Sequence, residues 1–401
     1  MLYREMGKTG DKVSVLGFGC MRFPQKDHKI DEERTEKQII SAIQQGVNYF
    51  DTAYMYPNSE AVLGRILAKG YRDKVMIATK LPPFQVHSYK DMENILDTEL
   101  TRLQTDHIDY YLMHGLFGMK GWQELKQLGV IEFLDKAKKS GKIRHIGFSY
   151  HGDKFQFKQI IDDYPWEFCQ IQYNYMDENH QAGLEGLEYA AAKGLGISIM
   201  EPLRGGMLAR INSNFEAGLN HSEQKRTPAE WALRFVWNHP GVSVVLSGMN
   251  EESQIEENIR IANDAKANSL SNSEIQFIRD TKKALSEKFK IGCTGCGYCL
   301  PCPMGVNIPM CFALYNDRYV YDNKSSMKHS YLFQLSGADG GGKGSHASLC
   351  KKCGKCETHC PQHIEIRNNL KAVSKEMESF YFKPFVAMVR GYISLRRLLK
   401  V

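Results

Sequence analysis

A chain of 401 residues is too long for one ordinary domain, but it can hold a barrel of about 250 residues and a smaller module. With 42% hydrophobic and 24% charged residues, the composition is typical of a soluble globular protein and excludes a chain that is disordered throughout. The net charge of +6 is modest for this length, so it does not by itself indicate a nucleic-acid-binding protein.

The N-terminal sequence MLYREMGKTG is polar and contains no apolar core of a signal peptide. No run of about 18 uncharged apolar residues occurs in the chain. We therefore expect neither secretion nor a membrane span, and we expect a cytoplasmic location.

Residues 13–265 alternate short β-rich apolar runs with amphipathic helical patterns, such as residues 32–46, where Ile39, Ile40, Ala42 and Ile43 share one face. The predicted strands are residues 13–19, 48–53, 74–80, 107–114, 143–149, 168–174, 196–202 and 242–248. No G-x-G-x-x-G follows the first strand. Eight regularly alternating strands favour an α/β fold of the (β/α)₈ TIM barrel type over an open Rossmann sheet.

Four polar residues stand at the carboxyl ends of these strands, where such barrels place their active sites. Asp51 and Tyr56 follow the second strand, Lys80 ends the third, and His114 ends the fourth. A lysine cation would lower the pKa of a tyrosine, which could then protonate a carbonyl oxygen as hydride arrives at carbon. Asp51 would hold Lys80, and His114 would orient the carbonyl. Each residue alone is more often a structural hydrogen-bonding group, but together they predict a catalytic set.

Helical patterns follow the eighth strand at residues 251–265 and 272–288, and a Gly-rich interval at 336–348 indicates a loop. The last 22 residues mix aromatic and basic side chains, which favours a helix that caps a second module over one that docks on a membrane or partner. The predicted domains are a barrel over residues 1–270, a helical connector over 271–288, and a mainly helical ferredoxin-like module over 289–401.

Nine of the eleven cysteines lie between residues 293 and 360, and this clustering marks the second module. Disulfides do not persist in a reducing compartment, so these thiols need another role. The motifs are Cys293-x₂-Cys296-x₂-Cys299-x₂-Cys302-Pro and Cys350-x₂-Cys353-x₂-Cys356-x₃-Cys360-Pro. Paired CxxC units can bind zinc, but a third cysteine and a following proline match the bacterial ferredoxin run. Two such runs predict two [4Fe-4S] clusters.

In ferredoxins with two clusters, the fourth cysteine of each run binds the other cluster, so Cys302 and Cys360 are expected to cross over. The first run has x₂ rather than x₃ before its last cysteine. This departure leaves Cys311 as an alternative to Cys302 as a cluster ligand. A buried apolar thiol is the favoured interpretation of Cys311.

The second module is also the basic part of the chain. From residue 289 onward there are sixteen Lys and Arg against seven Asp and Glu, a net charge of +9. This excess indicates either a basic surface patch or compensation for clusters that each carry about two negative charges with their thiolates.

The segments FDTAYMYPNSE, MIATK, YYLMH and GFSY resemble the aldo-keto reductase superfamily over residues 1–265. The whole chain resembles the bacterial and archaeal aldo/keto reductases that carry a C-terminal 4Fe-4S ferredoxin-type domain. The resemblance implies a nicotinamide cofactor, NAD(H) or NADP(H), lying across the barrel mouth without a Rossmann motif.

By position, the resemblance also implies which residues contact this cofactor. Ser149 and Gln170 would contact the carboxamide. The pyrophosphate would be lined by Pro202, Leu203, Gly205 and Gly206, and the adenosine end by Ser247, Gly248, Gln254, Glu257 and Asn258. Gly248 and Gln254 replace a Lys and an Arg that often bind a 2′-phosphate, which favours NADH, although Arg204 could substitute for them.

These features predict an iron-sulfur oxidoreductase that reduces a small-molecule carbonyl, or oxidises an alcohol, while its clusters exchange electrons with a redox partner protein. A hydride carries two electrons and a cluster accepts one, so a flavin that divides the pair is a further candidate cofactor. Two other classes remain open: an electron-transfer protein whose barrel is a scaffold, and a redox sensor that binds the cofactor without turnover. The substrate, the electron partner and the oligomeric state are not predicted.

Overall fold

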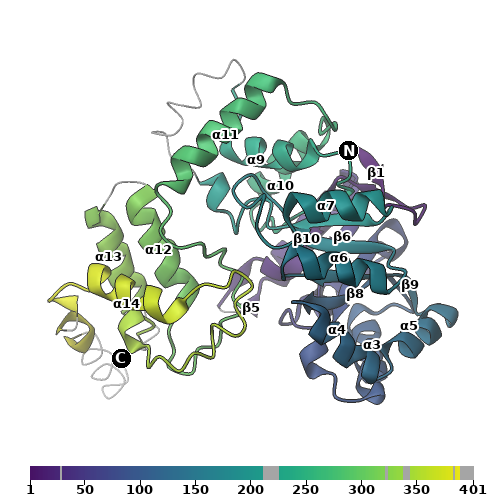
Figure 1. The fold of residues 1–401 in the computed structure, drawn as a ribbon, viewed down its shortest axis with the longest axis horizontal. Coiled ribbons are helices and arrows are strands. Elements are labelled where there is room, and N and C mark those ends of the chain that lie inside the picture. The colour runs from purple at the N-terminus through teal and green to yellow at the C-terminus, as the bar shows by residue number, and fades with distance from the viewer. Residues whose placement is uncertain (28, 211–224, 321–323, 337–343, 383, 389–401) are drawn as a thin grey trace. The chain divides into compact units, whose positions relative to one another are not determined.

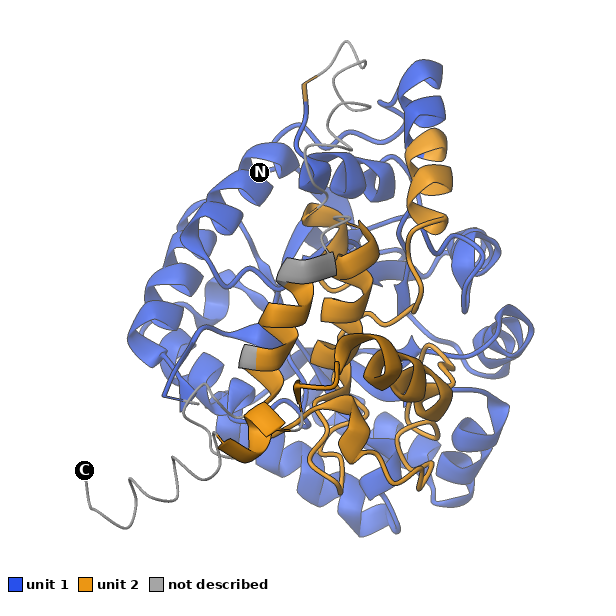
Figure 2. Cartoon of the chain, turned by 90° about the vertical axis from the view of Figure 1, so that its left-hand side faces the viewer, with its two compact units in different colours: residues 1–204, 226–278 blue, residues 205–225, 279–401 orange. Residues whose placement is uncertain are grey.

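The computed structural model describes the chain except for residues 28, 211–224, 321–323, 337–343, 383 and 389–401. Much of the predicted Gly-rich loop and of the C-terminal stretch therefore lies outside the described residues. The chain forms two compact units, which Figure 2 shows in different colours. The first unit comprises residues 1–204 and 226–278, and the second comprises residues 205–225 and 279–401.

The first unit is built on a closed barrel of eight parallel strands, which confirms the predicted fold class (Figure 1). Its strands are β3 (Leu16–Gly19), β6 (Tyr49–Asp51), β7 (Met76–Leu81), β8 (Ile108–Leu116), β9 (Ile143–Tyr150), β10 (Phe168–Gln172), β11 (Gly196–Met200) and β12 (Val244–Ser247). They neighbour one another in chain order, and β12 pairs with β3 to close the barrel. Each of the eight predicted strands overlaps one of them.

The first predicted strand divides in two. Only Leu16–Gly19 joins the barrel, whereas β2 (Lys12–Ser14) pairs antiparallel with β1 (Tyr3–Glu5). The guanidinium of Arg4 fixes this ribbon, because it donates hydrogen bonds to the carbonyls of Trp237, His239, Val242 and Ala265. A second short ribbon pairs β4 (Gln25–Lys26) with β5 (Lys29–Ile30).

Helices between the strands cover the barrel. They are α1 (Glu32–Gln44), α2 (Ser59–Leu67), α3 (Tyr89–Leu103), α4 (Met119–Gln127), α5 (Val130–Lys139), α6 (Lys154–Asp163), α7 (Gly183–Ala192), α9 (Pro228–Trp237) and α10 (Glu252–Ala262). Helix α1 shows why they form: Asp31 caps it by accepting from the Arg34 N–H, and Ile39, Ala42 and Ile43 are buried on one face.

The interior of the barrel is filled by side chains. This inner cluster consists of Met6, Val13, Tyr49, Ala78, Tyr110, Leu112, Phe168, Val244 and Leu246. A larger cluster fills the layer between the strands and the surrounding helices. Because the barrel is a packed core and not a pore, a ligand can reach it only at its ends, and such barrels use the carboxyl ends of the strands.

In the described part of the second unit, helices pack around a separate apolar core, to which many of the cysteines contribute. The helices are α12 (Ile308–Val320), α13 (Lys324–Leu335) and α14 (Ile366–Met377). Helix α11 (Asn272–Ser286) precedes them. The short 3₁₀ turns of the chain are η1 (Cys20–Arg22), η2 (Arg72–Lys74), η3 (Pro83–Gln85), η4 (Met207–Ala209) and η5 (Ala347–Leu349). Within the described part of the chain, no helix is both long and apolar enough to cross a membrane.

Candidate active site and iron-sulfur centre

An ion pair lies at the carboxyl ends of β6 and β7. The Lys80 ammonium is 2.8 Å from each carboxylate oxygen of Asp51, and it also donates to the Thr52 carbonyl at 2.6 Å. The exposed fractions of the two side chains are 1% for Lys80 and 6% for Asp51. Burial of a single charge would cost a large desolvation free energy. The attraction between Lys80 and Asp51, together with their hydrogen bonds, has to offset this cost.

Tyr56 and His114, the other predicted catalytic residues, lie beside this pair. The Lys80 Nζ atom is 5.3 Å from the centre of the Tyr56 ring. The rings of Tyr56 and His114 meet edge to face, with centroids 6.0 Å apart. Tyr56 is half-buried and His114 is buried. The structure therefore brings together all four residues that the strand-end pattern singled out.

His114 is neutral at physiological pH. Burial, the charge of Lys80 and the neighbouring His151 together hold the pKa of His114 well below its ordinary value. A neutral imidazole can donate a hydrogen bond to a carbonyl oxygen, but it cannot act as a strong acid. This charge state suits the predicted orienting role of His114 and leaves proton donation to Tyr56.

The two residues expected at a carboxamide already make hydrogen bonds within the barrel. Gln170 donates one amide hydrogen to Asp51 at 2.7 Å, and the Ser149 hydroxyl accepts from the Gly115 N–H at 2.7 Å. A side-chain amide has a second N–H and a carbonyl, and a hydroxyl can donate while it accepts. Both side chains therefore fit a carboxamide ligand, and Gln170 has the additional function of holding Asp51.

The residues expected at the adenosine end form local contacts after β12. Asn258 donates to the Ser247 hydroxyl at 3.1 Å, and Gln254 accepts from the Asn250 N–H at 3.1 Å. Glu257 accepts from the Thr227 hydroxyl. Gly248 stands beside Arg22, whose Cβ atom would be 3.8 Å from a Cβ placed on this glycine. Arg22 was not predicted, because a cation in a 3₁₀ turn after the first strand carries no local signal of a ligand.

The predicted pyrophosphate stretch divides between the units: Pro202 and Leu203 belong to the first, and Gly205 and Gly206 to the second. Gly205 has a φ of +68°, and a Cβ on it would lie 1.8 Å from the Thr294 carbonyl oxygen. Thr294 lies between two motif cysteines, Cys293 and Cys296. The glycine is therefore required both by its backbone conformation and by the close approach of the first cysteine loop.

A polar network next to the catalytic set was also not predicted. His151 follows β9 directly and is 6% exposed, and its Nδ1 lies 3.3 Å from the Gln181 amide oxygen. Gln181 donates to Gln172, and Gln172 donates to Asp177, which forms an ion pair with Arg204. His151 obeys the same strand-end rule as His114, so the pattern could have included it.

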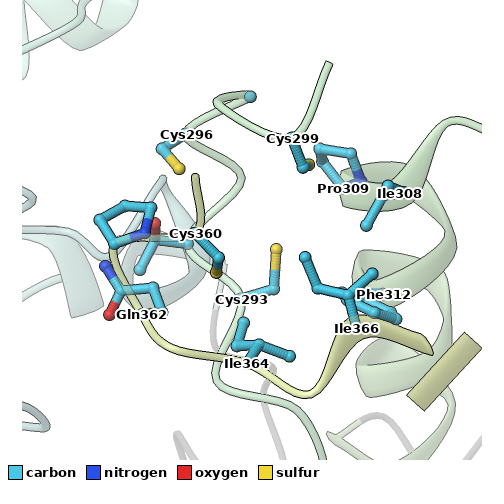
Figure 3. A pocket seen from close by; sticks show the side chains of 13 residues that line it. Cys293, Cys296, Cys299, Ile308, Pro309, Phe312, Cys360, Gln362, Ile364 and Ile366 are labelled. Atoms are coloured by element: carbon cyan, nitrogen blue, oxygen red, sulfur yellow. The ribbon is translucent and has the colours of Figure 1, made fainter. Parts of the chain in front are cut away.

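Four thiols surround one cavity in the second unit. Figure 3 shows the sulfur atoms of Cys293, Cys296, Cys299 and Cys360 directed toward a common space. Apolar side chains, including those of Ile308, Phe312, Ile364 and Ile366, complete the lining. The fourth thiol, that of Cys360, comes from the second motif.

Two of the remaining motif cysteines, Cys302 and Cys350, lie near Cys356. Burial, Glu357 and the neighbouring Cys350 and Cys302 raise the pKa of Cys356, so Cys302 lies with the second run. Cys311 is buried, and burial raises its pKa to about 12. Its sulfur is 3.8 Å from both the Tyr331 hydroxyl and the Ser345 carbonyl oxygen. These contacts suit a protonated structural thiol, which is the favoured interpretation of Cys311.

The thiols fit a cluster better than a single ion. Among the residues that the structure describes, no three His, Cys, Asp or Glu side chains are close enough to hold one metal ion. Four thiols around a wider, apolar cavity are what a cubane of iron and sulfide requires, because its irons lie apart and each takes one thiolate.

Buried side chains outside the motifs position both cysteine loops. The Asn316 side chain on α12 accepts from the backbone N–H groups of Lys290 and Ile291 and donates to the Ile291 carbonyl, just before the first motif. The Tyr331 hydroxyl accepts from the N–H of Ala347, a residue just before the second motif, and it donates to Glu378. Neither residue was predicted, because the contacts join segments that are far apart in the sequence.

Comparison with known families agrees with both sites. The model of the aldo/keto reductase family matches residues 15–280, and the model of a 4Fe-4S dicluster domain matches residues 292–365. The chain belongs to the aldo/keto reductase family. It is an oxidoreductase of that class, and it carries a C-terminal 4Fe-4S ferredoxin-type domain.

Its relatives match about two thirds of the chain. L-galactose dehydrogenase from Arabidopsis thaliana is 28% identical over 312 residues, which are 71% of this chain and 96% of the relative. The protein tas from Escherichia coli is 27% identical and covers 65% of this chain and 92% of its own. Among solved structures, the apo form of aldo-keto reductase AKR11C1 from Bacillus halodurans is 25% identical, with a TM-score of 0.56 over 70% of this chain and 96% of its own.

Proposed function

We propose that this protein uses NADH or NADPH to reduce a small-molecule carbonyl, or carries out the reverse oxidation of an alcohol, and that two [4Fe-4S] clusters relay electrons to or from a redox partner. The observation that carries the proposal is the buried Asp51–Lys80 pair beside Tyr56, in a chain whose second unit gathers four thiols around one cavity.

In the barrel, Tyr56 donates the proton. The ammonium of Lys80 stabilises the phenolate that remains after Tyr56 gives its proton to the substrate oxygen, and Asp51 keeps this ammonium in place. His114 donates a hydrogen bond that orients the carbonyl. The nicotinamide, when bound, supplies the hydride; Ser149 and Gln170 would hold its carboxamide.

In the second unit, Cys293, Cys296, Cys299 and Cys360 would hold one cluster. The second cluster would be held by Cys302, Cys350, Cys353 and Cys356. A cluster bound there supplies one-electron transfer. The lining of the first cavity is largely apolar and would influence the potential of the bound group. The many thiols suit a reducing compartment such as the cytoplasm.

The test begins with anaerobic purification followed by iron, sulfide and flavin analysis. The protein is then titrated with NADH and NADPH, and the clusters are followed by EPR. Reduction of a panel of aldehydes, ketones and sugars is measured next, since a sugar dehydrogenase is among the relatives. A protein that contains zinc, or that binds the nucleotide and turns over no substrate in the panel, would contradict the proposal.

Tyr56→Phe tests the barrel separately. Loss of the acid is expected to lower turnover by about 10² to 10⁴ fold, because general acid catalysis contributes on that scale. The cluster absorbance and the iron content should not change. Full activity of this variant would contradict the role of Tyr56 and favour a barrel that serves as a scaffold or sensor.

A further inference from the structure

We propose that the second cysteine loop and the exposed side of helix α14 form a docking surface for an acidic one-electron carrier protein. The inference rests on the proposed function, since it concerns where electrons enter or leave the clusters. We call this surface the lysine face, and it consists of Lys351, Lys352, Lys355, Arg367, Lys371 and Lys375, all of which are exposed.

The second loop presents both a cluster ligand and charge to solvent. Cys353 is the one exposed cysteine of the eleven, all of which the structure describes. It is flanked by Lys351, Lys352 and Lys355. Lys352 and Gly354 both have positive φ, of +58° and +81°, so the backbone turns sharply around Cys353. The exposed thiol therefore stands in a tight turn of the chain between exposed lysines.

Helix α14 continues the positive surface. It buries Ile366, Leu370, Val373 and Met377 against the core, at helical spacing. Arg367, Lys371 and Lys375 recur every four residues, so they form one stripe on its outer side. A Cβ on Gly354 would lie 3.6 Å from an Arg367 nitrogen, which shows that the stripe begins where the loop ends.

Little negative charge within this unit neutralises the lysine face. Glu357 forms an ion pair with Arg367 at 2.7 Å, and Glu365 lies at the start of the helix. The other two nearby carboxylates are engaged elsewhere: Glu376 accepts from Tyr315 and Tyr319, and Glu378 accepts from Tyr331. The five lysines therefore present a single sign of charge, which would steer an acidic protein toward Cys353.

The first cysteine loop differs from the second in its charge and in the surroundings of its thiols. Its sequence CTGCGYCLPC has no charged residue, and its thiols face an apolar cavity. Charges on exposed lysines are screened by water and contribute little to stabilising a bound cluster. Charge compensation alone therefore does not explain why the lysines gather at one loop. Positive charge and solvent exposure also favour the reduced state, which makes the second group the more suitable end of the relay.

The redox step at this surface moves one electron and forms or breaks no bond. The reduced cluster returns to its oxidised form, and the redox centre of the partner, a flavin or an iron-sulfur cluster, gains the electron. In the opposite direction the partner is oxidised and the cluster is reduced.

The experiment uses oxidised flavodoxin, an acidic one-electron carrier, as the probe. Holoprotein reduced with dithionite is mixed with it by stopped flow between about 0.02 and 0.3 M salt, a range over which the Debye length changes several-fold. We expect the second-order rate constant to fall roughly tenfold or more across this range, because electrostatic steering accelerates association by 10 to 10³ fold.

Two charge reversals locate the surface. The first is Lys351→Glu with Lys352→Glu and Lys355→Glu, and the second is Lys371→Glu with Lys375→Glu, which leaves the cysteine loop untouched. Both are expected to lower the rate constant at low salt by about tenfold and to weaken its salt dependence. Lys120→Glu with Lys139→Glu and Lys266→Glu, exposed lysines of the barrel unit, is the matched control and should leave the rate nearly unchanged.

Iron, sulfide and EPR spin quantitation accompany each variant. The inference is overturned if the α14 variant keeps full cluster content and reacts with flavodoxin as fast as the parent protein, or if the control slows equally. If the parent protein itself holds no cluster, the proposed function fails instead, so the two failures are distinguishable.

Discussion

The Lys80 ammonium is held between both carboxylate oxygens of Asp51, at 2.8 Å from each, with almost no access to water. The pair therefore serves two purposes. It keeps a positive charge beside the Tyr56 ring, and it ties strand β6 to strand β7 at the end of the barrel where the candidate site lies.

Asp51→Asn should damage stability and activity together. It leaves the buried ammonium of Lys80 without its counter-charge, which costs about 3 to 5 kcal/mol in comparable pairs. Chemical denaturation of the barrel and turnover measure the two effects. The control is Asp51→Asn combined with Lys80→Met, which removes both charges: it should recover much of the stability but none of the activity. Equal stability of the two variants would contradict the argument.

The pH dependence of stability should contain a contribution from His114. Its pKa in the folded protein lies well below that of the unfolded chain, so only the unfolded state takes up the proton as the pH falls below about 6.5. The free energy of unfolding then decreases by about 1.4 kcal/mol per pH unit from this group. His114→Gln should lose this part of the slope, which urea titrations between about pH 5 and 7 can measure. An unchanged slope would show that His114 protonates in the folded state.

Glu99 should destabilise the barrel at neutral pH. It is fully buried, and burial together with the neighbouring Glu60 raises its pKa well above the ordinary value. The unfolded chain releases this proton above about pH 4.5, so stability is lost as the pH rises from there toward the folded pKa.

The matched pair for this test is Glu99→Gln and Glu60→Gln. The first keeps the shape and removes the need for a proton, so at pH 7 it should raise the free energy of unfolding by about 1 kcal/mol or more. Burial also raises the pKa of Glu60, but this carboxylate forms a 3.0 Å ion pair with Arg102 that the substitution removes, so Glu60→Gln should stabilise the protein less than Glu99→Gln. Thermal unfolding compares the two, and a destabilised Glu99→Gln protein would refute the prediction.

Gly205→Ala should disturb the first cysteine loop. The added methyl group would overlap the Thr294 carbonyl oxygen, so the backbone next to Cys293 has to move. We expect less iron per chain and an altered EPR signal. Gly206→Ala is the control: that glycine also has positive φ, but the nearest atom to an added Cβ is the end of Arg210 at 3.9 Å. It should show only backbone strain of about 1 to 2 kcal/mol. Identical iron contents would contradict the steric argument.

The crossover of ligands can be tested by single cysteine replacements. Cys360→Ala should remove the cluster of the first group and keep that of the second, and Cys302→Ala should do the reverse. Cys311→Ala should keep both, because this thiol contacts a tyrosine and a carbonyl. Iron analysis and EPR of each variant decide the matter. Loss of a cluster in Cys311→Ala would make Cys311 the ligand.

The sequence predicted what local patterns encode. All eight barrel strands follow from apolar runs, and Asp51, Lys80 and His114 follow from the rule that chemistry lies at strand ends. Motif spacing predicted the cysteine groups. What it could not predict depends on distant contacts: Arg4 binds carbonyls more than 200 residues away, and Asn316 reaches back 25 residues to Ile291. The ribbon formed by Lys12–Ser14 was missed for the same reason, because its partner strand lies outside the barrel.

The thiols of the first cavity come from two segments that are far apart in the sequence of the iron-sulfur unit, with Cys360 far downstream of Cys293. A cluster bound by them would act as a cross-link, closing a long loop and limiting the freedom of the unfolded chain much as a disulfide does. Destruction of the cluster by oxygen would then remove this cross-link together with the route for electron transfer. An oxidised molecule would therefore be both inactive and easier for proteases to cut.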